Sequence, residues 1–138
     1  MSVPWRLVVR QNVMSAKATT GVWNTIKVSD FRHIIVSIAT ASSANLTVKA
    51  QWAIGTMTNE SAPTFSSAQS ATNMWDYVKM VDLNSGSTIA WDTWFSVTWT
   101  DDFKLYEINV NALDYINFEV TARSAGNVTI DVLCANNV

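Results

Sequence analysis

Alternation of apolar and polar residues with a period of two runs through this chain and restricts its fold more than any other feature. In NLTVKAQWAI, residues 45–54, Leu46, Val48 and Ala50 share one face, while Asn, Thr, Lys and Gln share the other. Period two is the repeat of a β-strand that buries one face. The helical period of 3.6 is nearly absent, so the sequence predicts an all-β protein.

The C-terminal region repeats this pattern in two neighbouring runs. YINFEVTA (115–122) and NVTIDVLC (127–134) each alternate. The residues expected to point inward are Ile116, Phe118, Val120, Val128, Ile130 and Val132, and those expected outward include Asn117, Glu119 and Thr121. SAGN (124–127) lies between the runs, and its Gly126 suits a tight turn. We therefore expect residues 115–134 to form a β-hairpin.

The remaining alternating runs predict further strands at 5–9, 22–28, 32–40, 77–83, 94–100 and 104–110. HIIVSIAT, within 32–40, is apolar on both faces at its start, which is typical of a central strand. About eight or nine strands separated by short turns favour an antiparallel β-sandwich, jelly-roll-like in its architecture.

A chain of 138 residues is expected to form one domain, here residues 1–138. We expect residues 1–20 to be an N-terminal arm that reaches a neighbouring molecule, with a short strand followed by the polar run SAKATTG. On this interpretation, removing residues 1–15 would leave the domain folded.

Composition disfavours several classes of partner. Charged residues make up 14% of the chain and the net charge is -2, without a basic patch. Binding to nucleic acid or to a membrane surface is therefore not expected. No apolar run approaches the length of a transmembrane helix, and the N-terminus does not resemble a signal peptide. The single cysteine, Cys134, alternates with apolar residues and is expected to be buried.

The residues that commonly carry catalysis are sparse. His33 is the only histidine, and no nucleophile motif accompanies it. Asp101 and Asp102 are adjacent in a turn, where turn chemistry explains them without catalysis. Glu107 and Glu119 are candidates for cross-strand neighbours on an outer face. One His, one Cys and four Gly offer neither a zinc site nor a phosphate loop. We expect no enzyme, metal or cofactor.

Aromatic side chains are the main candidates for binding. In WDTWFSVTWTDDF (91–103), parity predicts that Trp99 joins the core with Phe95 and Val97. The candidate interaction residues are Trp5, Trp23, Phe65, Trp75, Trp91 and Trp94. Two interpretations remain open for them. They form either a stacking platform for a sugar or base, or contacts within loops and between subunits, where aromatic residues are enriched.

Three stretches together carry a family likeness: IIVSIATASSANLTVKAQWAI, NMWDYVKMVDLNSGSTIA and TDDFKLYEINVNALDYINFEVTARSAGNVTIDV. In this order they resemble small β-sandwich virion proteins of tailed bacteriophages, over roughly residues 20–135. The resemblance implies a structural virion component made in the host bacterial cytoplasm, without a chemical active site. It includes head cement (decoration) proteins, which bind the major capsid protein as homotrimers. It also includes tail and adaptor subunits, and a carbohydrate-binding module of a tail spike or fibre is the alternative.

Overall fold

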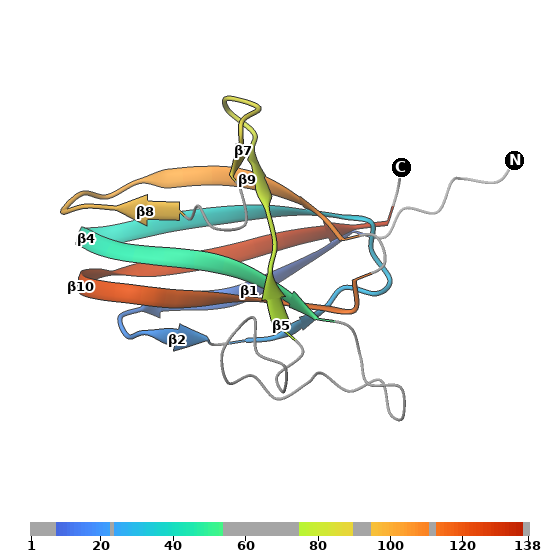
Figure 1. Ribbon diagram of the computed structural model, residues 1–138, viewed down its shortest axis with the longest axis horizontal. Helices are drawn as coiled ribbons and strands as arrows, with labels where there is room; N and C mark the ends of the chain where they lie inside the picture. Colours follow the sequence, from blue (N-terminus) through green and yellow to red (C-terminus); the bar gives the residue numbers. More distant parts are fainter. Residues whose placement is uncertain (1–7, 23, 54–74, 90–94, 111–112, 137–138) are drawn as a thin grey trace, which may run out of the picture.

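A computed structural model describes residues 8–22, 24–53, 75–89, 95–110 and 113–136, and every regular element in them is a β-strand (Figure 1). The ten strands are β1 (Val8–Lys17), β2 (Gly21–Val22), β3 (Ile26–Lys27), β4 (His33–Ala53), β5 (Trp75–Tyr77), β6 (Met80–Asp82), β7 (Thr88–Ile89), β8 (Phe95–Val97), β9 (Phe103–Asn109) and β10 (Tyr115–Ala135). All their pairings are antiparallel. The expected all-β antiparallel sandwich is confirmed. The described segments contain no helix able to cross a membrane.

Two strands of 21 residues, β4 and β10, form the centre of the fold. They pair with each other from Tyr115 opposite Ala53 to Ala135 opposite His33. Midway along, both strands turn back at the same end of the molecule, on the left of Figure 1. Both strands thereby pass from one layer of the sandwich into the other, and they are paired with each other in both layers. We call this turning point the corner, and it comprises residues 41–45 and 123–127.

Each layer is completed by strands that add to one half of this pair. Layer one has the order β1, the C-terminal half of β10, the N-terminal half of β4, then β9, β6 and β7. Layer two has β2 and β3 on the N-terminal half of β10, and β8 and β5 on the C-terminal half of β4. The central strand predicted at HIIVSIAT is confirmed, because β4 there has a partner on each side.

The core between the layers consists of the inward residues of the alternating pattern. Its largest fully buried side chains include Phe118, Met14, Ile34, Ile38, Ile108, Ile116 and Ile130. The inward positions expected in β10 are all buried, and so is Cys134. Across the layers, the rings of Phe95 (β8) and Tyr106 (β9) meet edge to face, with centroids 6.2 Å apart. Alternation therefore identified the core correctly along β10 and along β4 as far as Ala50, whereas Trp52, which parity also places in the core, is only half-buried.

The corner depends on unusual backbone conformations. Ser42 and Ser43 have φ of 66° and 51°, and Gly126 has φ of 75°. A Cβ atom on Gly126 would lie 2.5 Å from Cα of Ala44 and 2.6 Å from the carbonyl oxygen of Ala41. Only glycine therefore allows the bend of β10 to approach the bend of β4 so closely.

The two adjacent aspartates support the same corner. Oδ1 of Asp101 accepts a hydrogen bond from the backbone N–H of Ala44 at 3.2 Å. The backbone N–H of Asp102 donates to Oγ1 of Thr40 at 2.8 Å, and its carbonyl accepts from the N–H of Thr40 at 2.9 Å. The turn chemistry expected of these acids is confirmed, since the carboxylate of Asp101 binds Ala44 of β4 and the carboxylate of Asp102 accepts from the N–H of Phe103 at 2.8 Å.

The predicted C-terminal hairpin is wrong. Residues 115–123 and 127–135 do not pair with each other, and each half pairs with a different half of β4. The turn chemistry of SAGN, with its glycine at positive φ, was identified correctly. A hairpin and a corner require the same local conformation, and only the position of β4 decides between them.

The predicted N-terminal arm is also wrong for residues 8–17. These residues form β1, which pairs with β10 from Val8 opposite Ala135 to Lys17 opposite Val128. Val13 and Met14 are both fully buried although they are consecutive. A register shift between Asn12 and Met14 explains this, because a bulge turns two neighbouring side chains to one face.

Deletion of residues 1–15 is expected to destroy the cooperative fold. The deletion removes Val13 and Met14 from the core and exposes the hydrogen-bonding edge of β10, which then invites aggregation. Soluble yield and thermal unfolding followed by circular dichroism measure the effect. A soluble truncated chain that melts at the wild-type temperature would contradict the assignment of β1 to the sandwich.

Gly126→Ala is expected to lower the free energy of unfolding by about 2–5 kcal/mol, from the left-handed conformation together with the overlap at the corner. Gly86→Ala is the matched control. Gly86 has a similar φ of 72°, but nothing lies within 4 Å of the added Cβ. The control should lose about 1–2 kcal/mol, which reflects backbone strain alone. Equal losses for the two variants, measured by urea titration, would rule out close packing at the corner.

Candidate functional site

The described part of the chain does not gather the predicted interaction residues into one site. Trp5, Trp23, Phe65, Trp91 and Trp94 lie outside the described residues. Trp75 lies in β5, where its backbone is paired with that of Ala53.

The prediction that Trp99 is a core residue is wrong. Its neighbours Phe95 and Val97 are buried as expected, but Trp99 is 61% exposed. The reason is that β8 ends at Val97, so strand parity does not extend to residue 99. Trp99 also has a φ of 53°. For a bulky side chain this left-handed conformation costs about 1–2 kcal/mol. Its backbone is therefore in a conformation that bulky residues rarely adopt, and most of its side chain is left in solvent.

An exposed apolar groove lies beside β9 on the outer face of layer one. It is lined by Leu83, Asn84, Phe103, Lys104 and Leu105. Phe103 is 59% exposed, and the two leucines are about two-fifths exposed. Alternation in FKLYEIN was the available signal, because Tyr106 and Ile108 occupy the inward parity and leave Phe103 and Leu105 outward. Sequence analysis did not select these residues.

A buried polar cluster occupies the outer face of layer two. Gln51 and Asn117 are opposite each other on β4 and β10, and both are fully buried. Nε2 of Gln51 donates to Oε2 of Glu119 at 2.6 Å. Oε1 of Gln51 and both side-chain polar atoms of Asn117 have no hydrogen-bond partner among the described residues. Asn117 does point away from the interlayer core, as its parity predicted, but it is not exposed.

Burial dominates the electrostatics of this cluster. It raises the pKa of Glu119, against the hydrogen bond from Gln51 and the nearby charge of Lys49. It lowers the pKa of Lys49, against the attraction of Glu119. The carboxyl group is thus held toward its neutral form. Because the amides beside it are inaccessible to solvent, the cluster has the character of a structural polar layer.

Glu119 is expected to make stability depend on pH in a defined direction. Its pKa is higher in the folded than in the unfolded chain, so the folded state binds its proton more tightly. Its contribution to the free energy of unfolding therefore falls as the pH rises from below 4.5, its ordinary value, to above the raised value. Glu119→Gln keeps a hydrogen-bond acceptor for Gln51 but does not titrate. Urea titrations across this range should show the variant gaining stability over the wild type as pH rises. A constant or shrinking difference would contradict this assignment.

The remaining ionisable candidates do not converge. Nδ1 of His33 lies 3.4 Å from Oε1 of Glu107, and both side chains are more than one-third exposed. Glu107 and Glu119 are not cross-strand neighbours as predicted, because Glu107 is opposite Ile35 in layer one and Glu119 is opposite Lys49 in layer two. Burial raises the pKa of Cys134 to about 11, which makes its thiol a poor nucleophile near neutral pH.

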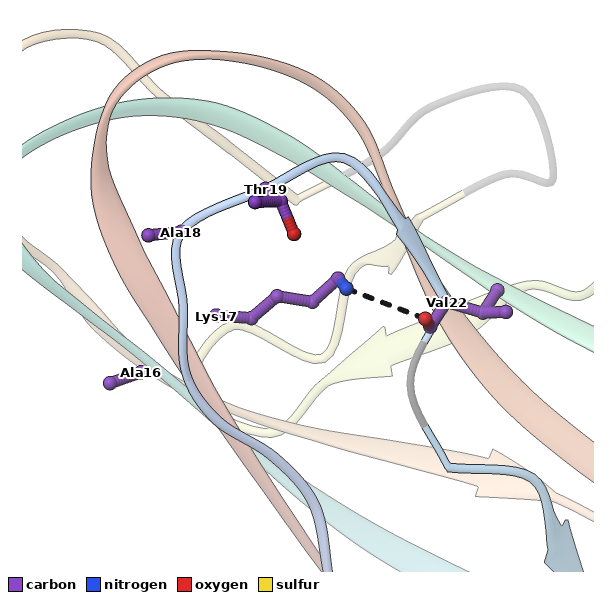
Figure 2. A pocket seen from close by; sticks show the side chains of 5 residues that line it. All are labelled: Ala16, Lys17, Ala18, Thr19 and Val22. Carbon is purple, nitrogen blue, oxygen red and sulfur yellow. Dashed lines mark hydrogen bonds between the residues drawn. The ribbon is translucent and has the colours of Figure 1, made fainter.

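A further hollow lies inside the turn between β1 and β2 (Figure 2). Ala16, Ala18, Thr19 and Val22 line it, and Nζ of Lys17 donates to the carbonyl oxygen of Val22 at 3.4 Å. The lysine thus binds the turn that contains it, and the other lining side chains are small, with the Thr19 hydroxyl as their one polar group. The segments that the structure describes hold no group of three or more His, Cys, Asp or Glu side chains suited to a metal ion.

Comparison with solved structures shows that this fold occurs in a prophage-derived protein and in a PBSX exported protein. The chain is similar to the SPBc2 prophage-derived protein YomS, with a TM-score of 0.68 and 13% identity over 99% of both chains. It is also similar to the PBSX exported protein XepA, with a TM-score of 0.69 and 9% identity. That match covers 99% of this chain and 40% of XepA. No protein-family model and no curated protein matches the chain. At these identities the likeness establishes a shared fold.

Proposed function

We propose that this chain is a structural component of a tailed-phage virion, and specifically a capsid cement protein. In this role it is made in the host bacterial cytoplasm and binds the outside of the head as a homotrimer. Its partner is the major capsid protein, and each trimer bridges neighbouring capsid subunits.

The observation that carries the proposal is the full-length match to a prophage-derived protein. YomS and this chain cover 99% of each other, so the likeness includes the whole sandwich rather than a common β-motif. The match to part of the PBSX exported protein XepA adds a second example of the same fold. The resemblance of the sequence to small virion β-sandwiches points to the same class of protein.

The surface of the described residues supports a binding role. Trp99, Phe103, Leu83 and Leu105 are large apolar side chains exposed near one end of β9. Exposed apolar surface of this kind is typical of protein interfaces. The contacts of ionisable side chains, by comparison, lie apart from one another, as in the His33–Glu107 contact and the turn contact of Asp101. A binding protein fits this distribution better than an enzyme does.

The architecture suits a load-bearing subunit. Because β4 and β10 continue through the corner, force applied across the two layers is carried by covalent backbone and paired hydrogen bonds. A sandwich held by interlayer packing alone could slide or separate. Many such copies, each contributing a contact of modest affinity, would add up to substantial reinforcement of a head under internal pressure.

Fractionation of phage particles tests the proposal. Particles purified on a density gradient are expected to contain the chain, and tailless heads are expected to contain it at the same ratio to the major capsid protein. Heads stripped of the chain should release DNA at a lower temperature and regain the wild-type temperature when purified chain is added.

The distribution of the protein distinguishes the alternatives. Presence in tails and absence from heads would replace the cement role with that of a tail or adaptor subunit. A chain found only in the soluble fraction of the lysate would reject a virion role altogether.

A further inference from the structure

Two exposed features lie at the same end of β9, and neither contributes to the core. One is the indole of Trp99, which we call the anchor. The other is the apolar groove lined by Leu83, Phe103 and Leu105. We propose that the anchor of one copy inserts into the groove of a second copy, so that copies of the chain associate head-to-tail into a closed ring. This rests on the proposed function and deepens it by naming the surface through which the homo-oligomer forms.

The anchor is held rigidly in an unfavourable conformation. Its φ of 53° is rare for a bulky residue, and 61% of the residue is in solvent. Next to it, the N–H of Thr100 donates to the carbonyl of Ala44 at 3.0 Å, and the carboxylate of Asp101 accepts from Ala44 N–H at 3.2 Å. Strained residues that the surrounding structure holds in place concentrate at functional positions. Tryptophan is also enriched among dominant interface residues.

The groove is complementary to the anchor in apolar character, and its charge is complementary to that of the residues that follow the anchor. Its apolar walls suit an indole ring, and Lys104 lies along it. The anchor is followed in sequence by the exposed carboxylates of Asp101 and Asp102. Inserting the anchor of one copy would therefore bring two acids toward a lysine of the next. A lysine ammonium near an indole face adds a cation–π attraction.

The exposed area is appropriate for the centre of a stable interface. Aromatic side chains carry about 150–250 Å² each, so Trp99, Phe103 and the two leucines leave roughly 400 Å² of apolar surface exposed. A standard interface buries about 800 Å² per partner, of which a little more than half is apolar. In a head-to-tail contact one partner contributes only the anchor and the other only the groove, so the four side chains together supply somewhat less than half of the apolar area of the two partners and form the centre of the contact, with Asn84 and Lys104 at its rim.

A second copy explains these features better than a glycan does. Sugar recognition needs polar groups that converge beside the aromatic ring, whereas the groove proposed as the partner surface is lined mainly by the apolar side chains of Leu83, Phe103 and Leu105. Asp101 accepts from Ala44, and Oδ1 of Asp102 accepts from the N–H of Phe103 at 2.8 Å. The latter contact also caps the edge of β9, which disfavours addition of a strand there. Because anchor and groove are different surfaces, the proposed contact is heterologous, and such a contact closes into a ring when the rotation between successive copies is a whole fraction of a turn, as the proposed homotrimer requires.

Light scattering and sedimentation of purified chain test the inference. The wild type is expected to have the mass of a closed oligomer of 15.3 kDa chains, with three chains matching the proposed cement role. Trp99→Asn removes the anchor, and because asparagine tolerates positive φ, the variant should fold at least as stably. Phe103→Thr with Leu105→Thr removes the groove and retains strand-forming residues. Each variant alone should have the mass of one chain. Val8→Asn, an exposed apolar residue on β1, is the control and should leave the mass unchanged.

Mixing the two variants is the decisive step. An equimolar mixture contains one intact anchor and one intact groove, so it should form a dimer of one chain of each kind, which neither variant forms alone. Absence of that dimer at about 1 mM chain, where even weak contacts are occupied, overturns the inference. A wild-type mass of one chain at every concentration, or unchanged association of Trp99→Asn, also overturns it. Binding of the chain to heads is measured separately. Absence of the ring would therefore not reject the virion role, and absence of the chain from virions would not prevent measurement of the ring.

Discussion

The pairing of β4 with β10 on both sides of the corner is the interaction on which the rest of the structure depends. β1, β2 and β3 attach to β10, whereas β5, β8 and β9 attach to β4. β6 and β7 reach the sheet only through β9. Each layer is therefore built outward from one half of the same two strands. The corner in turn depends on the absence of a side chain at Gly126.

The corner also connects the fold to the proposed binding surface. Asp101 and Thr100 both bind the backbone of Ala44, the residue against which Gly126 packs. The same contacts fix the turn that presents Trp99 to solvent. A projecting side chain on a loop would ordinarily lose entropy on binding. Here it is attached to the most constrained part of the sheet, which is a suitable position for an anchor in a virion subunit.

The outward-facing positions of layer two differ from those of layer one, because some of them carry buried polar side chains. Gln51 and Asn117 have the parity of surface residues but are fully buried, and they carry polar atoms without described partners. Unpaired buried polar groups cost about 1–3 kcal/mol each. Glu119, held toward its neutral form, adds to this polar layer. The two outer faces thus differ, because layer one exposes apolar side chains and layer two buries polar ones.

By itself, the sequence determined the strand class and, along β4 and β10, which side chains face the core, because period-two alternation is a local property of each strand. It also identified Gly126 as a turn residue and the aspartates as turn formers. Only the tertiary structure decided that residues 115–134 form a corner rather than a hairpin, that residues 8–17 belong to the sheet, and that Trp99 is exposed. Each of these depends on which distant strand supplies the hydrogen bonds, or on where a strand ends. Local periodicity carries no information about a partner that lies far away in the sequence.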